Sequence, residues 1–387
     1  MRVKLGDVFE IGSGGTPSKS HPEYYGGDIP WVKTGDLKNE YLYEVEDFIT
    51  EEGLKNSAAK VYEADTVLIA MYGATIGATS ILKINACTNQ ACAAFKKNEQ
   101  VIPEYLYYFL RSQKKKFVKD GVGGAQPNIS AGYLKKVEME LPSIEDQRVI
   151  VDILEKISDI VIKRKQEIQS LDNLIKARFV EMFGDPIHNP LGWDMVTFDE
   201  CLTSIENGKS FVCDSNAREG EHPGILKLSA ATYGVYKPEE NKAIIDSNDF
   251  VKSAEVHNGD LLFTRKNTPE LVGMAAYVEI TPNKLMMPDL IFRLNTNSKC
   301  NKIYMWKLIN HDLYRRQVES AASGSAKSMS NISKERLGRL SLPLPPIKLQ
   351  NEFADFVKQV DKSKVAVQKA LDETQLLFDS LMQKYFG

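Results

Sequence analysis

The chain repeats part of its own sequence at an offset of 203 residues. The tripeptide NIS stands at 128–130 and again at 331–333, and identities continue without a gap until Phe183-Gly184 meet Phe386-Gly387. Twelve of the 57 positions from Asn128 to Gly184 are identical, whereas average residue usage would give roughly 3 or 4 by chance. A repeat of this length predicts that the chain folds as two related halves.

Each copy of the repeat continues into a run in which apolar residues recur at alternating intervals of four and three. This spacing is typical of a coiled-coil helix. The seam residues are Ile150, Leu154, Ile157, Val161, Ile168, Leu171, Ile175 and Met182 in the first copy, and Phe353, Val357, Val360, Val367, Leu371, Phe378, Leu381 and Tyr385 in the second. Polar residues interrupt the seams at Arg164, Arg178, Lys364 and Thr374. We expect two helices of about 39 residues, each about 58 Å long. The matched register favours an intramolecular coiled coil over two unrelated surface helices.

The sequence before each long helix has the mixed character of an α/β domain. Residues 1–143 and 191–346 each show short β-like runs followed by a helix, near 103–119 in the first half and near 301–316 in the second. A strand is expected at the start of the chain, over residues 3–11. The predicted fold is therefore two globular α/β domains and two long helices, related by a pseudo-two-fold internal repeat.

The boundaries follow from helix stop signals. Gly184 and Pro186 end the first long helix, and PIHNPLGW at 186–193 is typical of a short linker. The predicted organisation is a domain at 1–143, a helix at 144–184, a second domain at 185–346 and a helix at 347–387.

The composition excludes several classes of protein. No apolar run reaches the roughly 18 residues of a membrane helix, and the N-terminus lacks the pattern of a signal peptide. Five cysteines, none spaced C-x-x-C, indicate neither a disulfide framework nor a zinc site. A cytoplasmic protein without metal or cofactor is expected. The net charge of −3 means that any nucleic-acid site must be a local cluster of cations.

Catalytic motifs are missing from the sequence. It has no (D/N)-P-P-(F/Y/W) loop of an amino-methyltransferase, no G-x-S-x-G, no H-E-x-x-H and no G-x-G-x-x-G. The stretch GSGGTPSKS at 12–20 approaches the phosphate-binding pattern G-x-x-x-x-G-K-(S/T), but Ser13 and Ser18 stand where that pattern needs glycine. We therefore expect a turn at this place, and a chain that is not an enzyme.

Basic and small polar residues instead predict contacts to a DNA backbone. RSQKKKF at 111–117 and HDLYRRQ at 311–317 each precede a loop rich in glycine, serine and amides, whose N–H and hydroxyl groups can approach phosphate oxygens. Lysines and arginines also stabilise helix C-termini, which is the alternative explanation. Arginine and asparagine at 265 and 267 could read guanine and adenine in the major groove.

The candidate DNA-binding residues lie in both halves. They are Thr16, Ser18, Lys19, Lys33, Thr34, Tyr72, Thr75, Asn89, Gln90, Lys114, Lys115, Lys116, Gln126 and Asn128 in the first, and Lys209, Lys227, Arg265, Lys266, Asn267, Arg315, Arg316, Lys327, Ser328 and Asn331 in the second. For Lys33 and Thr34, an equally good interpretation is that they only order a turn.

Several separated stretches resemble one known family. PSKSHPEYYGGDIPWVKTGDL, VLIAMYGATIGATSILKINACTNQACAAF and QPNISAGYLKKVEMELPSIEDQ are similar to the specificity subunit of type I restriction–modification systems. SGSAKSMSNIS and LSLPLPPIKLQNEF resemble the second copy in that family. The resemblance covers essentially the whole chain. One departure is HPGILKLSAAT at 222–232, which lacks the TGD of its first-half counterpart.

The resemblance implies a function that the residue patterns alone do not. It implies two target-recognition domains, each reading one half of a bipartite, asymmetric site in double-stranded DNA, and an antiparallel coiled coil that spaces them. It also implies docking of two modification subunits, which methylate adenine with S-adenosylmethionine, and of restriction subunits that use ATP. The specificity subunit itself would be non-catalytic.

Two alternatives stay open at this point. A coiled-coil adaptor that holds two protein-binding domains would show the same helices and repeat, without salt-dependent DNA binding. A single-chain methyltransferase–nuclease is disfavoured by the missing methylation motifs.

Overall fold

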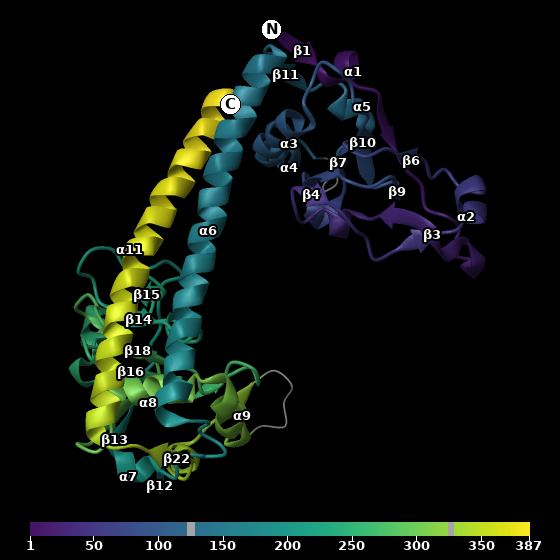
Figure 1. Ribbon diagram of the computed structural model, residues 1–387. Helices are drawn as coiled ribbons and strands as arrows, with labels where there is room; N and C mark the ends of the chain where they lie inside the picture. The colour runs from purple at the N-terminus through teal and green to yellow at the C-terminus, as the bar shows by residue number, and fades with distance from the viewer. Residues whose placement is uncertain (122–127, 324–328) are drawn as a thin grey trace. The chain divides into compact units, whose positions relative to one another are not determined.

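The computed structural model divides into two compact units, and Figure 1 shows the chain that forms them. The structure describes residues 1–121, 128–323 and 329–387. Unit 1 comprises Met1–Lys165 and Lys369–Gly387, and unit 2 comprises Gln166–Gln368. The two cuts in the chain, after residues 165 and 368, are 203 residues apart (368 − 165), which is the offset of the sequence repeat.

Unit 1 is an α/β domain built on two sheets. Its elements before the long helix are β1 (Arg2–Lys4), α1 (Leu5–Val8), β2 (Ile11–Ser13), β3 (Tyr25–Val32), β4 (Tyr41–Leu42), β5 (Phe48–Ile49), α2 (Glu51–Lys55), β6 (Val61–Tyr62), β7 (Val67–Ala70), β8 (Thr79–Leu82), β9 (Ala86–Thr88), β10 (Cys92–Phe95), α3 (Pro103–Ser112), α4 (Lys114–Asp120), α5 (Ala131–Leu134) and β11 (Glu138–Glu140). The sheets have the strand orders β2-β10-β7-β8-β4 and β5-β3-β9-β6, and β1 pairs with β11. The apolar faces of α3 and of the five-stranded sheet form the main core of the unit.

Unit 2 has the same plan with one strand fewer in its main sheet. Its elements are β12 (Asp194–Thr197), α7 (Phe198–Cys201), β13 (Leu202–Asn207), β14 (Gly224–Leu226), β15 (Asn241–Ala243), β16 (Leu261–Thr264), β17 (Lys266–Asn267), β18 (Ala275–Tyr277), β19 (Leu285–Met286), β20 (Ile291–Thr296), α8 (Lys302–Ile309), α9 (Asp312–Ser320), β21 (Ser330–Asn331), α10 (Lys334–Gly338) and β22 (Ser341–Leu344). The order β13-β20-β16-β18 repeats β2-β10-β7-β8, and the smaller sheet is β15-β14-β19. Within the described residues no strand of unit 2 corresponds to β4.

The long helices are α6 (Ile144–Phe183) and α11 (Ile347–Phe386), and in each unit their segments run antiparallel, as predicted. Every seam residue named above is buried or half-buried. The polar interruptions meet across the seam: the Arg164 guanidinium donates to the carbonyl of Ala370 and the hydroxyl of Thr374 in unit 1. In unit 2 Lys364 pairs with Asp172. Among the described residues, no helix is long and apolar enough to cross a bilayer.

A buried glutamine joins each long helix to its domain. Gln147, with no exposed surface, accepts from the Ile102 N–H at 2.9 Å and donates to the carbonyls of Gln100 and Pro142 at 2.9 and 3.1 Å. Gln350, 203 residues later and equally buried, accepts from Asn301 at 2.8 Å. It donates to the carbonyls of Lys299 and Pro345 at 3.1 and 2.6 Å. The helix therefore begins at a fixed place on the domain in both units.

The local predictions needed three corrections. The strand expected over residues 3–11 is wrong, because the chain turns into α1 after Lys4, where the Leu5 N–H bonds to the Val137 carbonyl at 2.9 Å. The single helix near 103–119 is the pair α3 and α4, separated at Gln113. The helix near 301–316 is the pair α8 and α9, because the His311 ring accepts from the Leu313 N–H and starts a new helix.

The segment 186–193 is a hydrogen-bonded turn. The Asn189 amide exchanges hydrogen bonds with the backbone of Trp193 at 2.7 and 2.9 Å, and the Trp193 indole donates to the Phe183 carbonyl at 3.0 Å. These bonds fix the path of the chain from α6 into β12.

Candidate nucleic-acid interface

The glycine-rich loop after β2 is held against the end of β9. A Cβ added at Gly14 would lie 1.8 Å from the Thr88 carbonyl oxygen, and the Gly15 N–H donates to that oxygen at 2.9 Å. The same contact recurs in unit 2, where a Cβ at Gly208 would lie 2.1 Å from the Pro288 carbonyl oxygen. At Gly14 and Gly208 the close approach of two backbones leaves no room for a side chain. The loop at 12–20 is therefore not a phosphate-binding loop but a turn, as expected from its sequence.

In each loop one hydroxyl is hydrogen-bonded to a residue that follows another strand, β9 in unit 1 and β19 in unit 2. The Thr16 hydroxyl donates to the Gln90 amide oxygen in unit 1, and the Ser210 hydroxyl donates to the Asp289 carboxylate in unit 2. Sequence reasoning missed Ser210 and Asp289 as site residues. The signal that could have found them is Gly208, which follows Gly14 by 194 residues and begins the equivalent loop.

A lysine precedes an equivalent 3-10 turn in each unit. Lys33 precedes the turn Thr34–Asp36, and Lys227 precedes Leu228–Ala230, so the second unit makes this turn without the TGD sequence. Lys33 pairs with Asp47, and the Lys227 ammonium lies 3.8 Å from the Glu240 carboxylate. Both lysines are half-buried.

The NIS motif packs beside the first residues after β7 and β16. The Ile129 N–H donates to the Met71 carbonyl at 2.9 Å, and the Ile332 N–H donates to the Arg265 carbonyl at 2.8 Å. As a result Asn128 lies opposite Tyr72 in unit 1. In unit 2 Asn331 lies opposite Lys266, so Tyr72 and Lys266 occupy the same place in the two units.

Three of the predicted side chains in unit 2 have partners inside the protein. The Asn267 amide is buried and donates to the Thr232 hydroxyl at 3.1 Å. The Arg315 guanidinium donates to the carbonyls of Gly273 and Val272 at 3.0 and 2.7 Å, and burial lowers its pKa. Arg265 lies over the Phe292 ring at 4.9 Å and donates to Asn331 at 3.2 Å. These contacts order the loops, and a DNA contact by any of the three stays a prediction.

The remaining candidates are distributed as follows. Ser18, Lys19, Gln90, Lys114, Lys115, Lys116, Asn128, Lys209 and Arg316 are exposed, and Thr75 and Asn89 are half-buried. Gln126, Lys327 and Ser328 lie outside the described residues. Lys114 packs against the turn at Gly77, where an added Cβ would lie 2.9 Å from its Cγ.

In each unit the structure thus brings together the loops that follow the ends of four strands. In unit 1 these are the loops after β2, β3, β7 and β9, joined by hydrogen bonds from Asn89 to Val32 and from Met71 to Ala91 at 2.9 and 2.8 Å. They present the exposed Tyr72 and Gln90 with the half-buried Lys33. Hydroxyls, amides, an aromatic ring and lysines on loops of this kind can bind phosphates and base edges.

The comparison with known proteins agrees with this duplication. The chain matches the family described as "Type I restriction modification DNA specificity domain" twice, over residues 1–173 and 190–374. The MjaIX specificity subunit of Methanocaldococcus jannaschii is 25% identical over 98% of this chain and 91% of that protein. The EcoEI specificity subunit of Escherichia coli is 33% identical, over 51% of this chain and 34% of its own length.

Two solved structures share the fold. The S subunit of a type I restriction–modification system from M. genitalium has a TM-score of 0.58 at 15% identity, covering 100% of this chain and 96% of that one. A second, described as "Structural basis underlying complex assembly and conformational transition of the type I R-M system", has a TM-score of 0.61 at 16% identity, covering 100% and 97%. With the specificity domain matched in both halves, the chain belongs to the type I restriction–modification specificity family.

Proposed function

We propose that this chain is the non-catalytic DNA-recognition subunit of a type I restriction–modification system. Each of its two domains reads one half of a bipartite target in double-stranded DNA, and the chain directs modification and restriction subunits to that target. The observation that carries the proposal is the double match to the DNA specificity domain. The adaptor alternative has no such observation in its favour.

The recognition surface in this proposal is the cluster of strand-end loops in each unit. We assign the first half-site to the domain within residues 1–143 and the second to the domain within 185–346. The two units share a fold but must read different sequences. Positions that are equivalent in the two units but carry different residues are therefore the best candidates for selecting the bases. Tyr72 in unit 1 and Lys266 in unit 2 are such a pair.

The partners and their stoichiometry belong to the same proposal. Two modification subunits, one for each copy of the repeat, carry S-adenosylmethionine and methylate adenine, and restriction subunits supply ATP-dependent cleavage. The assembled complex acts in the cytoplasm as a defence against phage DNA. This chain contributes position and sequence choice to that complex.

The test is a methylation map of cells that carry the system with and without variants of this chain. Tyr72→Ala should relax the bases of one half-site and Lys266→Ala those of the other. Tyr43→Ala is the matched control, because Tyr43 is 67% exposed and lies outside the loop cluster of unit 1. Replacing residues 1–143 by those of another family member should change one half-site only. The proposal would be contradicted by a map in which the domain exchange altered both half-sites or neither, or in which Tyr72→Ala and Lys266→Ala did so.

A further inference from the structure

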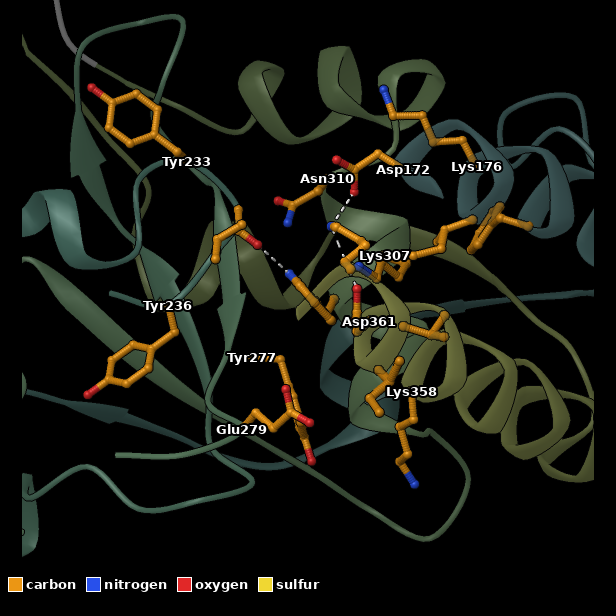
Figure 2. Close-up of a pocket in the computed structure, with 18 of the residues that line it drawn as sticks. Asp172, Lys176, Tyr233, Tyr236, Tyr277, Glu279, Lys307, Asn310, Lys358 and Asp361 are labelled. Carbon is orange, nitrogen blue, oxygen red and sulfur yellow. Dashed lines mark hydrogen bonds and ion pairs between the residues drawn. The ribbon is translucent and has the colours of Figure 1, made fainter. Parts of the chain in front are cut away.

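Unit 2 contains a cleft of about 760 Å³ next to the edge of β18. Its floor is formed by Tyr277, Ile303 and Trp306, and its two sides by residues of α6 and α11. Figure 2 shows Lys307 in this cleft, between Asp172 and Asp361. The rim carries apolar side chains that are largely exposed, among them Val235 at 53% and Ile280 at 75%. None of these residues is among the candidate DNA-binding residues.

The corresponding space in unit 1 is filled by the chain itself. There β4 pairs with β8, where the N–H groups of Ile81 and Lys83 donate to the carbonyls of Glu40 and Leu42 at 2.7 and 2.9 Å. Tyr41 points across this edge, and its hydroxyl donates to carboxylates of α3 and α6, those of Glu104 at 3.4 Å and Glu155 at 3.2 Å. An extended segment with an aromatic side chain is therefore the occupant that this architecture accepts.

The same segment of unit 2 leaves the edge of its sheet uncovered. Lys227 corresponds to Lys33, so Gly234 and Val235 stand where unit 1 has Glu40 and Tyr41. The Gly234 carbonyl accepts from the Trp306 indole at 2.9 Å, whereas the Glu40 carbonyl of unit 1 accepts from the strand N–H of Ile81. Val235 is too short to cross the space that Tyr41 fills.

The backbone of β18 is oriented to accept a further strand. Val278, next to the strand, exchanges hydrogen bonds with Asp260 and Gly259 at 2.9 and 2.7 Å on the β16 side. Because backbone groups alternate along a strand, the N–H and C=O of Tyr277 face the other way, toward the cleft. Those of Ala275 are already bonded by the Asn310 amide at 2.9 and 2.7 Å, which ends the open edge at that point.

The cleft also holds a cation without a direct counter-ion. Lys307 makes no ion pair within the part of the chain that the structure describes, and its ammonium lies 3.4 Å from the centre of the Trp306 ring. The neighbouring carboxylates of Asp172 and Asp361 are both within ion-pair distance of Lys364 instead. Burial lowers the pKa of Lys307 to about 8, so a carboxylate placed beside it would gain a charge-assisted hydrogen bond.

We propose that the cleft binds an extended segment of a partner protein, which adds to the edge of β18 and places an aromatic side chain in the cleft beside Tyr277 and a carboxylate beside Lys307. This is strand addition, in which main-chain hydrogen bonds supply affinity and a side-chain pocket supplies specificity. The bound segment completes in unit 2 the strand arrangement that β4 completes in unit 1.

A suitable probe is a labelled peptide with the sequence KNEYLYE, residues 38–44 of this chain, which contains β4 and its neighbouring glutamates. Fluorescence anisotropy with the full-length chain should show saturable binding. Lys307→Met should weaken it about tenfold, the value of one charge-assisted hydrogen bond, and Val235→Trp, which fills the cleft, should abolish it. Tyr108→Phe is the matched control, because Tyr108 stands 199 residues earlier at the position of Lys307 and should leave binding unchanged.

Three further measurements distinguish the possible outcomes. Hydrogen exchange at the Tyr277 amide should slow when the peptide binds, and a peptide with alanine at the first tyrosine should not bind. DNA binding by Lys307→Met should equal that of the parent chain, which separates this site from DNA recognition. Absence of saturable binding by the folded chain would overturn the proposal. So would binding that is insensitive to Val235→Trp, or equally weakened by Tyr108→Phe.

Discussion

Replacing Gln350 by leucine should destabilise unit 2 and leave unit 1 almost unaffected. The side chain is fully buried at the start of α11 and bonds to three backbone groups of unit 2. Leucine has a similar volume but no hydrogen-bonding group, so the Asn301 N–H and the carbonyls of Lys299 and Pro345 would lose their partner without gaining access to water.

The size of the effect follows from those three groups. A buried donor left without a partner costs about 1–3 kcal/mol, and a carbonyl somewhat less because of its second lone pair. We therefore expect a loss of about 3–5 kcal/mol in the free energy of unfolding of unit 2. Gln147→Leu should produce the same loss in unit 1, where the three bonds recur.

Hydrogen exchange resolved by peptide is the appropriate assay, because it reports on the two units separately. Protection should fall in β20 and α8 for Gln350→Leu, and in β10 and α3 for Gln147→Leu. Gln359→Leu, an exposed position on the same helix, should change stability by less than about 0.5 kcal/mol. A loss below about 1 kcal/mol, or equal losses in both units, would refute the reasoning.

Three other outcomes follow from the structure. Burial and, to a smaller extent, the nearby Glu155 raise the pKa of Glu40 to about 7. The folded state therefore favours the protonated carboxyl. The resulting contribution to the free energy of unfolding is present at low pH and is lost as the pH rises through about 7. The melting temperature of the parent chain should therefore fall more between pH 5 and 8 than that of Glu40→Gln, and parallel pH profiles would contradict this. Insertion of one heptad into both long helices, after residues 165 and 368, lengthens each helix by about 10 Å and should lengthen the DNA spacer by about 3 base pairs. Selection from a randomised-spacer DNA library would measure the spacer, and recovery of the original spacer would argue against this prediction. DNA affinity of the assembled complex should fall steeply with salt, and Lys33→Met should reduce the slope of log K against log salt by about 1, whereas an unchanged slope would exclude a phosphate contact there.

The helices could be predicted from sequence because their signal is local and periodic. The heptad pattern depends only on neighbouring residues, and the offset of 203 is constant from Asn128 to the end of the chain. In the domains the offset drifts: Lys33 and Lys227 are 194 residues apart, Gly77 and Gly273 are 196 apart, and the Tyr105–Tyr304 pair is 199 apart. Because the offset changes along the domains, a search at one offset finds the helices and misses most of the duplicated domain.

Other features depend on tertiary contacts that no spacing encodes. In the loop at 12–20, the Thr88 carbonyl leaves no room for a Cβ at Gly14, and the backbone of Ala58 leaves none at Gly15, although both residues are far along the chain. In unit 2 the carbonyl of Gly234, at the position of Glu40, accepts from the Trp306 indole, whereas the Glu40 carbonyl accepts from a strand N–H in unit 1. Arg315 and Asn267 have the residue types of DNA contacts, but the structure shows that their donors are bonded inside the protein.

The division of the chain into two units has a consequence for the order of folding. Unit 2 is continuous, so all of its residues have been synthesised once Gln368 has been added. Unit 1 is discontinuous: the ring of Phe386 lies 5.2 Å from that of Tyr105, and Phe378 lies 6.3 Å from Tyr108. The aromatic face of α3, although made early, therefore stays uncovered until the last helix segment arrives. A chain truncated after Gln368 should therefore hold a folded second unit and an open first one, and the apolar surface exposed in that first unit favours aggregation or chaperone binding.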